Sequence, residues 1–170
     1  MFDGERDPRP DEAWIGFGSN LGDREAAIGA ALRELGDLVT AISPVWETAP
    51  WGVLDQPWFL NGVAQLRWTG SARELLETCL AVERRLGRVR GGPKFGPRGI
   101  DLDVLVCGPG CVREDGLIVP HPGIAERRSV LEPWADLAPE LRVPGLGETV
   151  GILRDRARAR LGREQPARRR

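Results

Sequence analysis

Two aspartates, Asp101 and Asp103, lie two residues apart in the apolar run GIDLDVLV near the middle of the chain. Residues 100–106 read as a buried strand, and because strand side chains alternate between faces, both carboxylates should project to the same side, with Cα atoms roughly 7 Å apart. Two such carboxylates repel each other unless a cation is bound. Since no Cys or His lies beside the pair, the oxygen ligands favour Mg²⁺ or Mn²⁺ over zinc, and Mg²⁺ points to a phosphate substrate. The alternative is an exposed strand edge that carries two solvated acids.

A basic segment, LGRVRGGPKFGPR, leads into this strand. Its glycines and prolines predict a loop, and the glycines give it the mobility that a lid over a substrate needs. In polyphosphate transfer, metal ions bridge the phosphates, while each arginine binds phosphate oxygens bidentately and stabilises the developing charge. A cationic loop before an acidic strand therefore indicates such chemistry, and the alternative is a solvated basic loop. The cations are Arg88, Arg90, Lys94 and Arg98.

The length and composition limit the class of protein. A chain of 170 residues fits one domain with a real core, and its formal net charge of −1 argues against a non-specific nucleic-acid binder. The three cysteines have no CxxC spacing, which argues against a disulfide framework and a zinc site. The chain also lacks an apolar signal segment or membrane span. We therefore expect a cytoplasmic protein that binds no membrane or nucleic acid. We also expect it to be a monomer.

The local patterns predict the element order strand, helix, strand, strand, helix, strand. This is the order of an α+β, ferredoxin-like βαββαβ sandwich, with both helices on one face of an antiparallel sheet. Asp23 and Gly36 are expected to begin and end the first helix, and Ser71 with Glu74 forms a capping box that opens the second. The predicted elements span 13–19, 22–36, 38–50, 59–68, 72–87 and 100–106.

The two ends and the region after the fourth strand read differently from this core. Residues 1–12 are charged and predict a disordered leader, residues 161–170 predict a solvated basic tail, and residues 13–160 predict the domain between them. The Pro- and Gly-rich region after the fourth strand reads as an extension that decorates the core. It carries His121, the only histidine. A lone histidine is more often structural, and a contact to phosphate or substrate is the alternative.

One further carboxylate, Glu83, is out of place in the second predicted helix. It continues the apolar stripe of Leu76, Cys79 and Leu80, which places it on or beside the buried face. A carboxylate there needs a partner, and Arg88 or Arg90 just past the helix end could supply one. The alternative is that Glu83 bends outward at the rim.

Several separated motifs resemble the 6-hydroxymethyl-7,8-dihydropterin pyrophosphokinase family of folate biosynthesis, over about residues 13–143 and in the family's order. The resemblance implies a ferredoxin-like α+β fold, two Mg²⁺ ions, and transfer of the β,γ-diphosphate of ATP to the hydroxymethyl oxygen of the pterin, with release of AMP. The motifs are FGSNLGD (17–23), ETAPWG with DQPWFLN (47–61), LGRVR followed by GPRGIDLDVLV (86–106) and VPH with ER (119–127).

The resemblance also implies roles for individual residues. Asp101 and Asp103 would bind both Mg²⁺ ions. On the ATP side, phosphate contacts or supporting roles would fall to Arg88, Arg90, Arg98, Val104, His121 and Arg127, of which Arg88 and Arg98 are catalytic together with the two acids. On the pterin side, Asn61 would bond the amide edge of the ring, Phe59 would stack on its face, and backbone groups around Thr48, Pro50 and Trp51 would complete recognition.

The chain departs from the family where a second aromatic residue usually stacks on the other face of the pterin, because Ser129 stands there. Losing one stacking face costs on the order of 1 kcal/mol, so we expect weaker pterin binding unless Trp51 substitutes. Three alternatives stay open: another Mg²⁺-dependent nucleotidyl or phosphoryl transferase, a low-activity relative with altered pterin binding, and a non-enzymatic ferredoxin-like binding module. A module for RNA would display exposed aromatic residues on its central strands.

Overall fold

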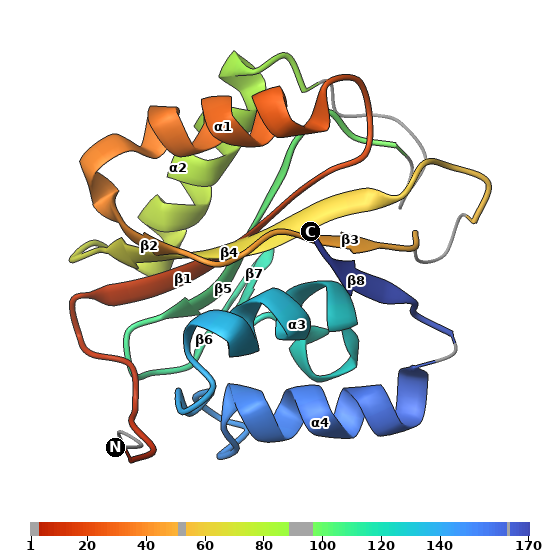
Figure 1. The fold of residues 1–170 in the computed structure, drawn as a ribbon. Coiled ribbons are helices and arrows are strands. Elements are labelled where there is room, and N and C mark those ends of the chain that lie inside the picture. The colour runs from red at the N-terminus through yellow and green to blue at the C-terminus, as the bar shows by residue number, and fades with distance from the viewer. Residues whose placement is uncertain (1–3, 51–53, 89–96, 163) are drawn as a thin grey trace.

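A six-stranded sheet lies between two layers of helices in the computed structural model, which describes residues 4–50, 54–88, 97–162 and 164–170. The helices α1 (Arg24–Leu35) and α2 (Ala72–Arg85) cover one face, and α3 (Arg128–Leu137) and α4 (Val150–Leu161) lie on the other side (Figure 1). None of the helices within these ranges combines the length and the apolar character needed to cross a membrane.

The strand order is that of a ferredoxin-like fold, so the predicted fold class is confirmed. Strand β1 is central and pairs antiparallel with β4 on one side and β5 on the other, β2 and β3 both pair with β4, and β8 adds to β3. A separate hairpin joins β6 and β7. The bounds are β1 (Glu12–Ser19), β2 (Val39–Ile42), β3 (Trp46–Thr48), β4 (Phe59–Arg67), β5 (Asp101–Cys107), β6 (Val112–Glu114), β7 (Leu117–Val119) and β8 (Ala167–Arg169), with short 3₁₀ turns at Gly36–Leu38 and Ile124–Glu126.

The helix ends form as their sequences predict. The side chain of Asp23 accepts a hydrogen bond from the N–H of Ala26 and begins α1. Gly36 ends α1 with a φ of 55°, a conformation that suits glycine. Ser71 and Glu74 make both bonds of the capping box at the start of α2. These local signals are strong because each is complete within four residues.

The single strand expected over 38–50 is divided into β2 and β3. At the break, the hydroxyl of Ser43 accepts a hydrogen bond from the N–H of Val63 in β4 (2.9 Å). Pro44 has no N–H to donate to a ladder. The hydroxyl of Ser43 therefore takes the place of a backbone acceptor in the pairing with β4. The chain resumes backbone pairing with β4 at Trp46.

The region after β5 was expected from its sequence only to decorate the core, but it builds a second core. Its helices bring Leu131 and Trp134 onto the second face of the sheet, where they form a core with Trp14 of β1 and Leu105 of β5. The first face packs against α1 and α2 in a separate core. Both faces of the sheet are therefore buried, which explains why β1 and β5 read as nearly continuous apolar runs.

Both chain ends differ from their sequence-based interpretation. Arg6 donates two hydrogen bonds of 2.9 Å to the buried carboxylate of Glu12, and its backbone bridges to Leu141, so residues 4–12 are not the disordered leader that was expected. Within 161–170, β8 pairs with β3 instead of forming a solvated tail. Composition could not reveal either, because Leu141 lies more than a hundred residues from Arg6 along the chain, and β3 lies more than a hundred residues from β8.

Candidate active site

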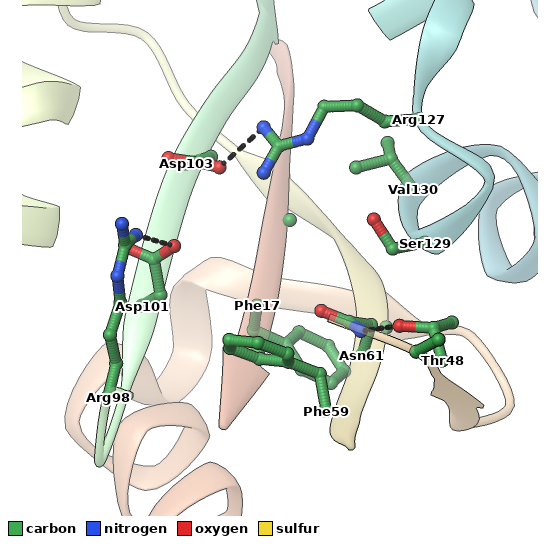
Figure 2. Close-up of a pocket in the computed structure, with 14 residues that line it drawn as sticks. Phe17, Thr48, Phe59, Asn61, Arg98, Asp101, Asp103, Arg127, Ser129 and Val130 are labelled. Atoms are coloured by element: carbon green, nitrogen blue, oxygen red, sulfur yellow. Dashed lines mark hydrogen bonds and ion pairs between the residues drawn. The ribbon is translucent and has the colours of Figure 1, made fainter. Parts of the chain in front are cut away.

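The two aspartates project from the same face of β5 into a pocket over the centre of the sheet (Figure 2). Opposite them on β1 stand two glycines, with Gly18 paired to Asp101 and Gly16 to Asp103. Gly18 is in turn paired to Asn61 on β4. Asp101 and Asn61 therefore face the same pocket two strands apart, or roughly 10 Å at about 4.8 Å per strand. The glycines leave room between them for a flat ligand. The lining residues are Gly16, Phe17, Gly18, Thr48, Ala49, Phe59, Asn61, Gly62, Arg98, Asp101, Asp103, Arg127, Ser129 and Val130.

Three arginines neutralise the acid pair. Arg88 Nη1 lies 2.6 Å from Asp101 Oδ1, and Arg98 Nη1 lies 2.7 Å from the other oxygen of the same carboxylate. Arg127, which comes from the segment before α3, lies 3.1 Å from Asp103 Oδ2 (Figure 2). The structure thus brings together predicted phosphate ligands from three parts of the chain. The guanidinium groups held here can exchange a carboxylate partner for a phosphate. The planar carboxylate and the tetrahedral phosphate are both anions whose oxygens accept two parallel N–H bonds from arginine.

Glu83, a residue of α2, contacts both Arg88 and the strand that carries the two aspartates. Its buried carboxylate accepts hydrogen bonds from Arg88 Nη1 and, at 2.8 Å, from the backbone N–H of Leu102. The prediction that Arg88 or Arg90 supplies a partner for Glu83 is confirmed for Arg88. Because Leu102 lies between the two aspartates, Glu83 fixes both the arginine and the strand that presents the acids.

Sequence reasoning did not single out Asn20, which the structure places at the junction of three segments. Its Oδ1 accepts from the backbone N–H of Arg98 (2.8 Å), and its Nδ2 donates to Gln56 Oε1 (2.8 Å) and to the carbonyl oxygen of Pro57 (2.9 Å). Asn20 is buried. It therefore ties the arginine segment to the segment before β4. The sequence did hold one signal for a role of Asn20: it lies in the motif FGSNLGD, directly after the glycine-containing end of a strand.

The opposite end of the pocket is less charged. Asn61 Nδ2 donates to Thr48 Oγ1 at 2.7 Å, which fixes the orientation of the amide (Figure 2). Phe59 projects into the same pocket beside Phe17. Ala49 lines the pocket, whereas Pro50 is buried and is not among the lining residues. An aromatic face next to an oriented amide is what a flat heterocycle with a polar edge requires.

Ser129 lies on the wall that α3 forms, next to Val130 and across the pocket from Phe59 (Figure 2). In the part of the pocket that the structure describes, the aromatic rings Phe17 and Phe59 lie on one side only. Trp51, the proposed substitute, lies outside the described residues, as do Arg90 and Lys94.

A second cavity of about 330 Å³ adjoins the first on the other side of Asp103, which lines both. Val104 and His121 line this second cavity together with apolar side chains of α2 and β7. His121 Nδ1 accepts from the N–H of Gly123 (3.1 Å), and burial lowers the pKa of the imidazole. The neutral ring therefore carries its proton on Nε2, where it can donate to an oxyanion.

The described residues contain no cluster of three or more His, Cys, Asp or Glu side chains able to hold a metal ion. A cation at this site would therefore have two protein carboxylates, Asp101 and Asp103, and would complete its shell with ligand oxygens and water. Mg²⁺ binds in this way in phosphate-transfer enzymes, whereas a structural zinc site needs four protein ligands.

Comparisons with known proteins identify the family of this chain. Residues 14–139 match the family model described as 7,8-dihydro-6-hydroxymethylpterin-pyrophosphokinase (HPPK). A relative from Methylorubrum extorquens named 2-amino-4-hydroxy-6-hydroxymethyldihydropteridine pyrophosphokinase is 42% identical over 142 residues, which cover 81% of this chain and 88% of that protein. A relative from Bacillus subtilis with the same name is 38% identical over 133 residues, which cover 76% of this chain and 79% of that protein.

Solved structures show the same fold at low sequence identity. An HPPK-DHPS in complex with substrates matches with a TM-score of 0.72 at 12% identity, over 91% of this chain. A Plasmodium falciparum HPPK-DHPS matches with a TM-score of 0.70 at 14% identity, over 90% of this chain. This chain spans 44% of the length of each of those proteins. On the family match and the two relatives, the chain belongs to the 7,8-dihydro-6-hydroxymethylpterin-pyrophosphokinase family.

Proposed function

We propose that this chain transfers the β,γ-diphosphate of ATP to the hydroxymethyl oxygen of 6-hydroxymethyl-7,8-dihydropterin and releases AMP. Membership of the family supports pyrophosphokinase activity in folate biosynthesis. The observation that carries the residue-level proposal is the row Asp101, Gly18, Asn61 across three neighbouring strands. It separates a carboxylate that would handle phosphate from an amide that would recognise the heterocycle, at opposite ends of one pocket.

The pterin would lie over the glycines of β1. Because Asn61 donates through Nδ2 to Thr48, its Oδ1 is oriented to accept an N–H from the edge of the ring. Phe59 would stack on one face of the ring. In this pose the hydroxymethyl group points from Asn61 toward Asp101 and Asp103, where the diphosphate must arrive.

ATP would occupy the second cavity, with its base and ribose against Val104 and its phosphates at Asp103. His121 would donate from Nε2 to a phosphate oxygen, and Arg88, Arg98 and Arg127 would exchange their carboxylate partners for phosphate oxygens. Since Asp103 lines both cavities, the β-phosphorus and the hydroxymethyl oxygen would meet beside it.

The residues fit the two Mg²⁺ ions that we propose. Asp101 and Asp103 present oxygen ligands on one face of β5, and each has an arginine partner that phosphate can take over. Bound Mg²⁺ would neutralise phosphate charge and orient the phosphate oxygens. The protein's own contribution is positioning and charge stabilisation by the arginines, which suffices for phosphoryl transfer without a covalent intermediate. The hydroxymethyl oxygen of the pterin forms a bond to the β-phosphorus of ATP as the bond from that phosphorus to the α,β-bridging oxygen breaks. AMP leaves with the bridging oxygen, and the hydroxyl proton passes to solvent.

Replacing Gly18 with alanine should raise the pterin KM by about tenfold, because losing one well-placed hydrogen bond costs about 1.4 kcal/mol. A Cβ at position 18 would lie 2.5 Å from Asn61 Oδ1, so the amide must rotate away from its position. The ATP KM should stay within twofold. Steady-state kinetics with each substrate varied in turn measure both constants.

Gly16→Ala provides the matched control on the same strand face, since the nearest atoms to its Cβ would be those of the Leu105 side chain, at 3.6 Å. Its effect on the pterin KM should be smaller than that of Gly18→Ala. Equal effects of the two substitutions would count against a role for Gly18 in placing Asn61.

Introducing a ring at position 129 should tighten pterin binding. Ser129→Phe places an aromatic side chain across the pocket from Phe59, and a second stacking face contributes about 0.5–1.5 kcal/mol, or roughly a three- to tenfold lower Kd. Fluorescence titration with the pterin measures the Kd, and Ser129→Ala, which removes the hydroxyl without adding a ring, should leave it nearly unchanged. An unaltered Kd in Ser129→Phe would show that the missing ring is already compensated.

The binding half of the proposal is tested by titrating the pterin in the presence and absence of Mg²⁺ and a non-hydrolysable ATP analogue. Trp58, next to Phe59, supplies an intrinsic fluorescence signal close to the pocket. We expect pterin binding that depends on nucleotide and Mg²⁺ and that Asn61→Ala weakens. No nucleotide-dependent pterin binding by the unmodified chain would contradict the assignment.

We further propose that the enzyme acts as a monomer in the cytoplasm. The three cysteines are free thiols in the structure, which accords with a reducing compartment. Size-exclusion chromatography with light scattering, at the protein concentration of the assay, tests the oligomeric state.

A further inference from the structure

The last strand of the chain lies directly against the strand that carries the pterin-side residues. Strand β8 pairs with β3 in the register Trp46 to Arg169, Glu47 to Arg168 and Thr48 to Ala167 (Figure 1). The pairing extends beyond the strand, because the N–H of Ala49 donates to the carbonyl oxygen of Pro166 at 3.1 Å. Thr48 and Ala49, both lining residues of the pocket, are therefore held by backbone contacts from the far end of the sequence.

Side chains reinforce this contact through Glu47. Arg168 donates from Nε (2.8 Å) and from Nη2 to Glu47 Oε2, while Arg24 Nη1 donates to Glu47 Oε1 at 2.9 Å. The Glu47 side chain is 10% exposed, so this carboxylate is largely removed from water. A carboxylate paired with two arginines in such a position is held in one orientation.

The same two arginines reach the segment that leads into β4. The guanidinium of Arg168 lies 5.3 Å from the ring centroid of Trp58, in cation–π contact. Arg24 Nη1 also donates to the carbonyl oxygen of Trp58 at 2.7 Å. Trp58 directly precedes Phe59, the proposed stacking residue. One cluster, made of Arg24, Glu47, Trp58 and Arg168, thus joins β8 to residues next to both Thr48 and Phe59.

Strand β3 needs such support because it is only three residues long. Without β8 it would be an edge strand with one row of backbone groups open to solvent, and short edge strands open locally at low free-energy cost. Opening β3 would release Thr48 Oγ1 from Asn61 Nδ2, a bond of 2.7 Å that orients the amide.

We infer that Arg168, together with β8, is a positioning residue for the pterin side of the site. This inference rests on the proposed function and adds to it: Arg168 holds Glu47 and Trp58 so that Thr48, Asn61 and Phe59 are preorganised for the pterin. It touches neither the acid pair nor the second cavity. The ATP side should therefore be insensitive to it.

The test compares Arg168→Ala with Arg170→Ala in the full chain. Arg168 has a side chain that is 69% exposed, so its removal should leave the fold intact. Arg170 makes a 3.6 Å ion pair with the exposed Glu25 and is the matched control. We expect Arg168→Ala to raise the pterin KM three- to tenfold, with kcat and the ATP KM within twofold of the unmodified chain, and Arg170→Ala to leave all three within twofold. Arg168→Lys should recover only part of the loss, since lysine keeps the charge but not the paired donors.

A second variant removes residues 166–170 and keeps Gln165, whose contacts with Arg128 and Glu126 belong to α3 and its approach. We expect a larger rise in the pterin KM than in Arg168→Ala, again with the ATP KM unchanged. If both variants lower only the melting temperature, or raise both KM values equally, β8 is merely an edge cover and the inference is wrong. Absence of pterin-dependent AMP formation by the unmodified chain would instead refute the proposed function itself.

Discussion

Replacing Asp101 and Asp103 by asparagine, singly, should lower kcat by about 10²- to 10³-fold, because each substitution removes a proposed charged ligand of the Mg²⁺ that would stabilise the transferring phosphates. Asparagine keeps the shape of the side chain, and both aspartates lie at the wall of an open pocket. The fold should therefore survive. The pterin Kd, measured without nucleotide, should change little, since Asn61 and Phe59 lie at the other end of the pocket.

The measurement is the initial rate of AMP formation as Mg²⁺ is varied, with the melting temperature recorded for each variant. We expect the Mg²⁺ concentration for half-maximal rate to rise in both. Asp37→Asn, an exposed aspartate in the 3₁₀ turn after α1, is the control and should behave like the unmodified chain. Activity retained within tenfold in either site variant would show that the carboxylates are not essential ligands.

Replacing Glu132 by alanine should destabilise the protein by about 3–5 kcal/mol, as is found when one partner of a buried ion cluster is removed. The Glu132 side chain is fully buried and accepts hydrogen bonds from Arg128 Nε (2.9 Å) in α3 and Arg158 Nε (3.0 Å) in α4. Without it, the largely buried Arg128 guanidinium loses its carboxylate partner between the helices that cover the second face, and the half-exposed Arg158 loses its ion pair. For a chain of this size, the melting temperature should fall by about 10 °C.

The pH dependence provides an independent readout of Glu132. Burial raises the pKa of this carboxyl, but the hydrogen bonds from Arg158 and Arg128 outweigh it and hold the pKa below its ordinary value of 4.5. The folded state therefore binds this proton less readily than the unfolded state, so the stabilisation is present above about pH 4.5 and is lost as the pH falls through the folded-state pKa. Denaturant unfolding from pH 6 to pH 3 should show a shallower loss of stability in Glu132→Gln.

Glu148 is a suitable comparison because it pairs with Arg156 on the surface. Surface ion pairs contribute about 0–1 kcal/mol, so Glu148→Ala should shift the melting temperature by only a few degrees. If Glu132→Ala were as mild as Glu148→Ala, the buried cluster would not be a main link between α3 and α4.

Local sequence signals predicted the part of the fold whose elements form through contacts between neighbouring residues. The Asp23 cap, the capping box at Ser71 and the strand that presents Asp101 and Asp103 each depend on a few neighbouring residues. The second helical layer was missed for physical reasons. Pro133 lies inside α3 and reads as a helix breaker. In α4, Arg154 and Arg156 stand between the buried residues Leu153 and Ala157. The buried Arg128 and Glu132 read as surface charges until their partners are known.

The candidate site shows the same division. The alternation of a strand predicted the shared face of Asp101 and Asp103, and the family resemblance indicated Asn61, Phe59 and Arg127. The structure gathers these residues in one pocket from β5, β4 and the start of α3. Asn20 and Arg168 were not found, because their roles depend on contacts between segments far apart in the chain. Arg168 in particular belongs to a stretch that composition alone presents as a solvated tail.

The central claim is that a diphosphate, and not a single phosphate or a nucleotidyl group, is transferred to the pterin. Quantifying the nucleotide and pterin products after incubating the purified chain with ATP, Mg²⁺ and 6-hydroxymethyl-7,8-dihydropterin tests it most directly. We expect AMP and the pterin diphosphate in equal amounts, with neither formed when Mg²⁺ or the pterin is left out. Formation of ADP or free pyrophosphate in place of AMP with the pterin diphosphate would contradict the account.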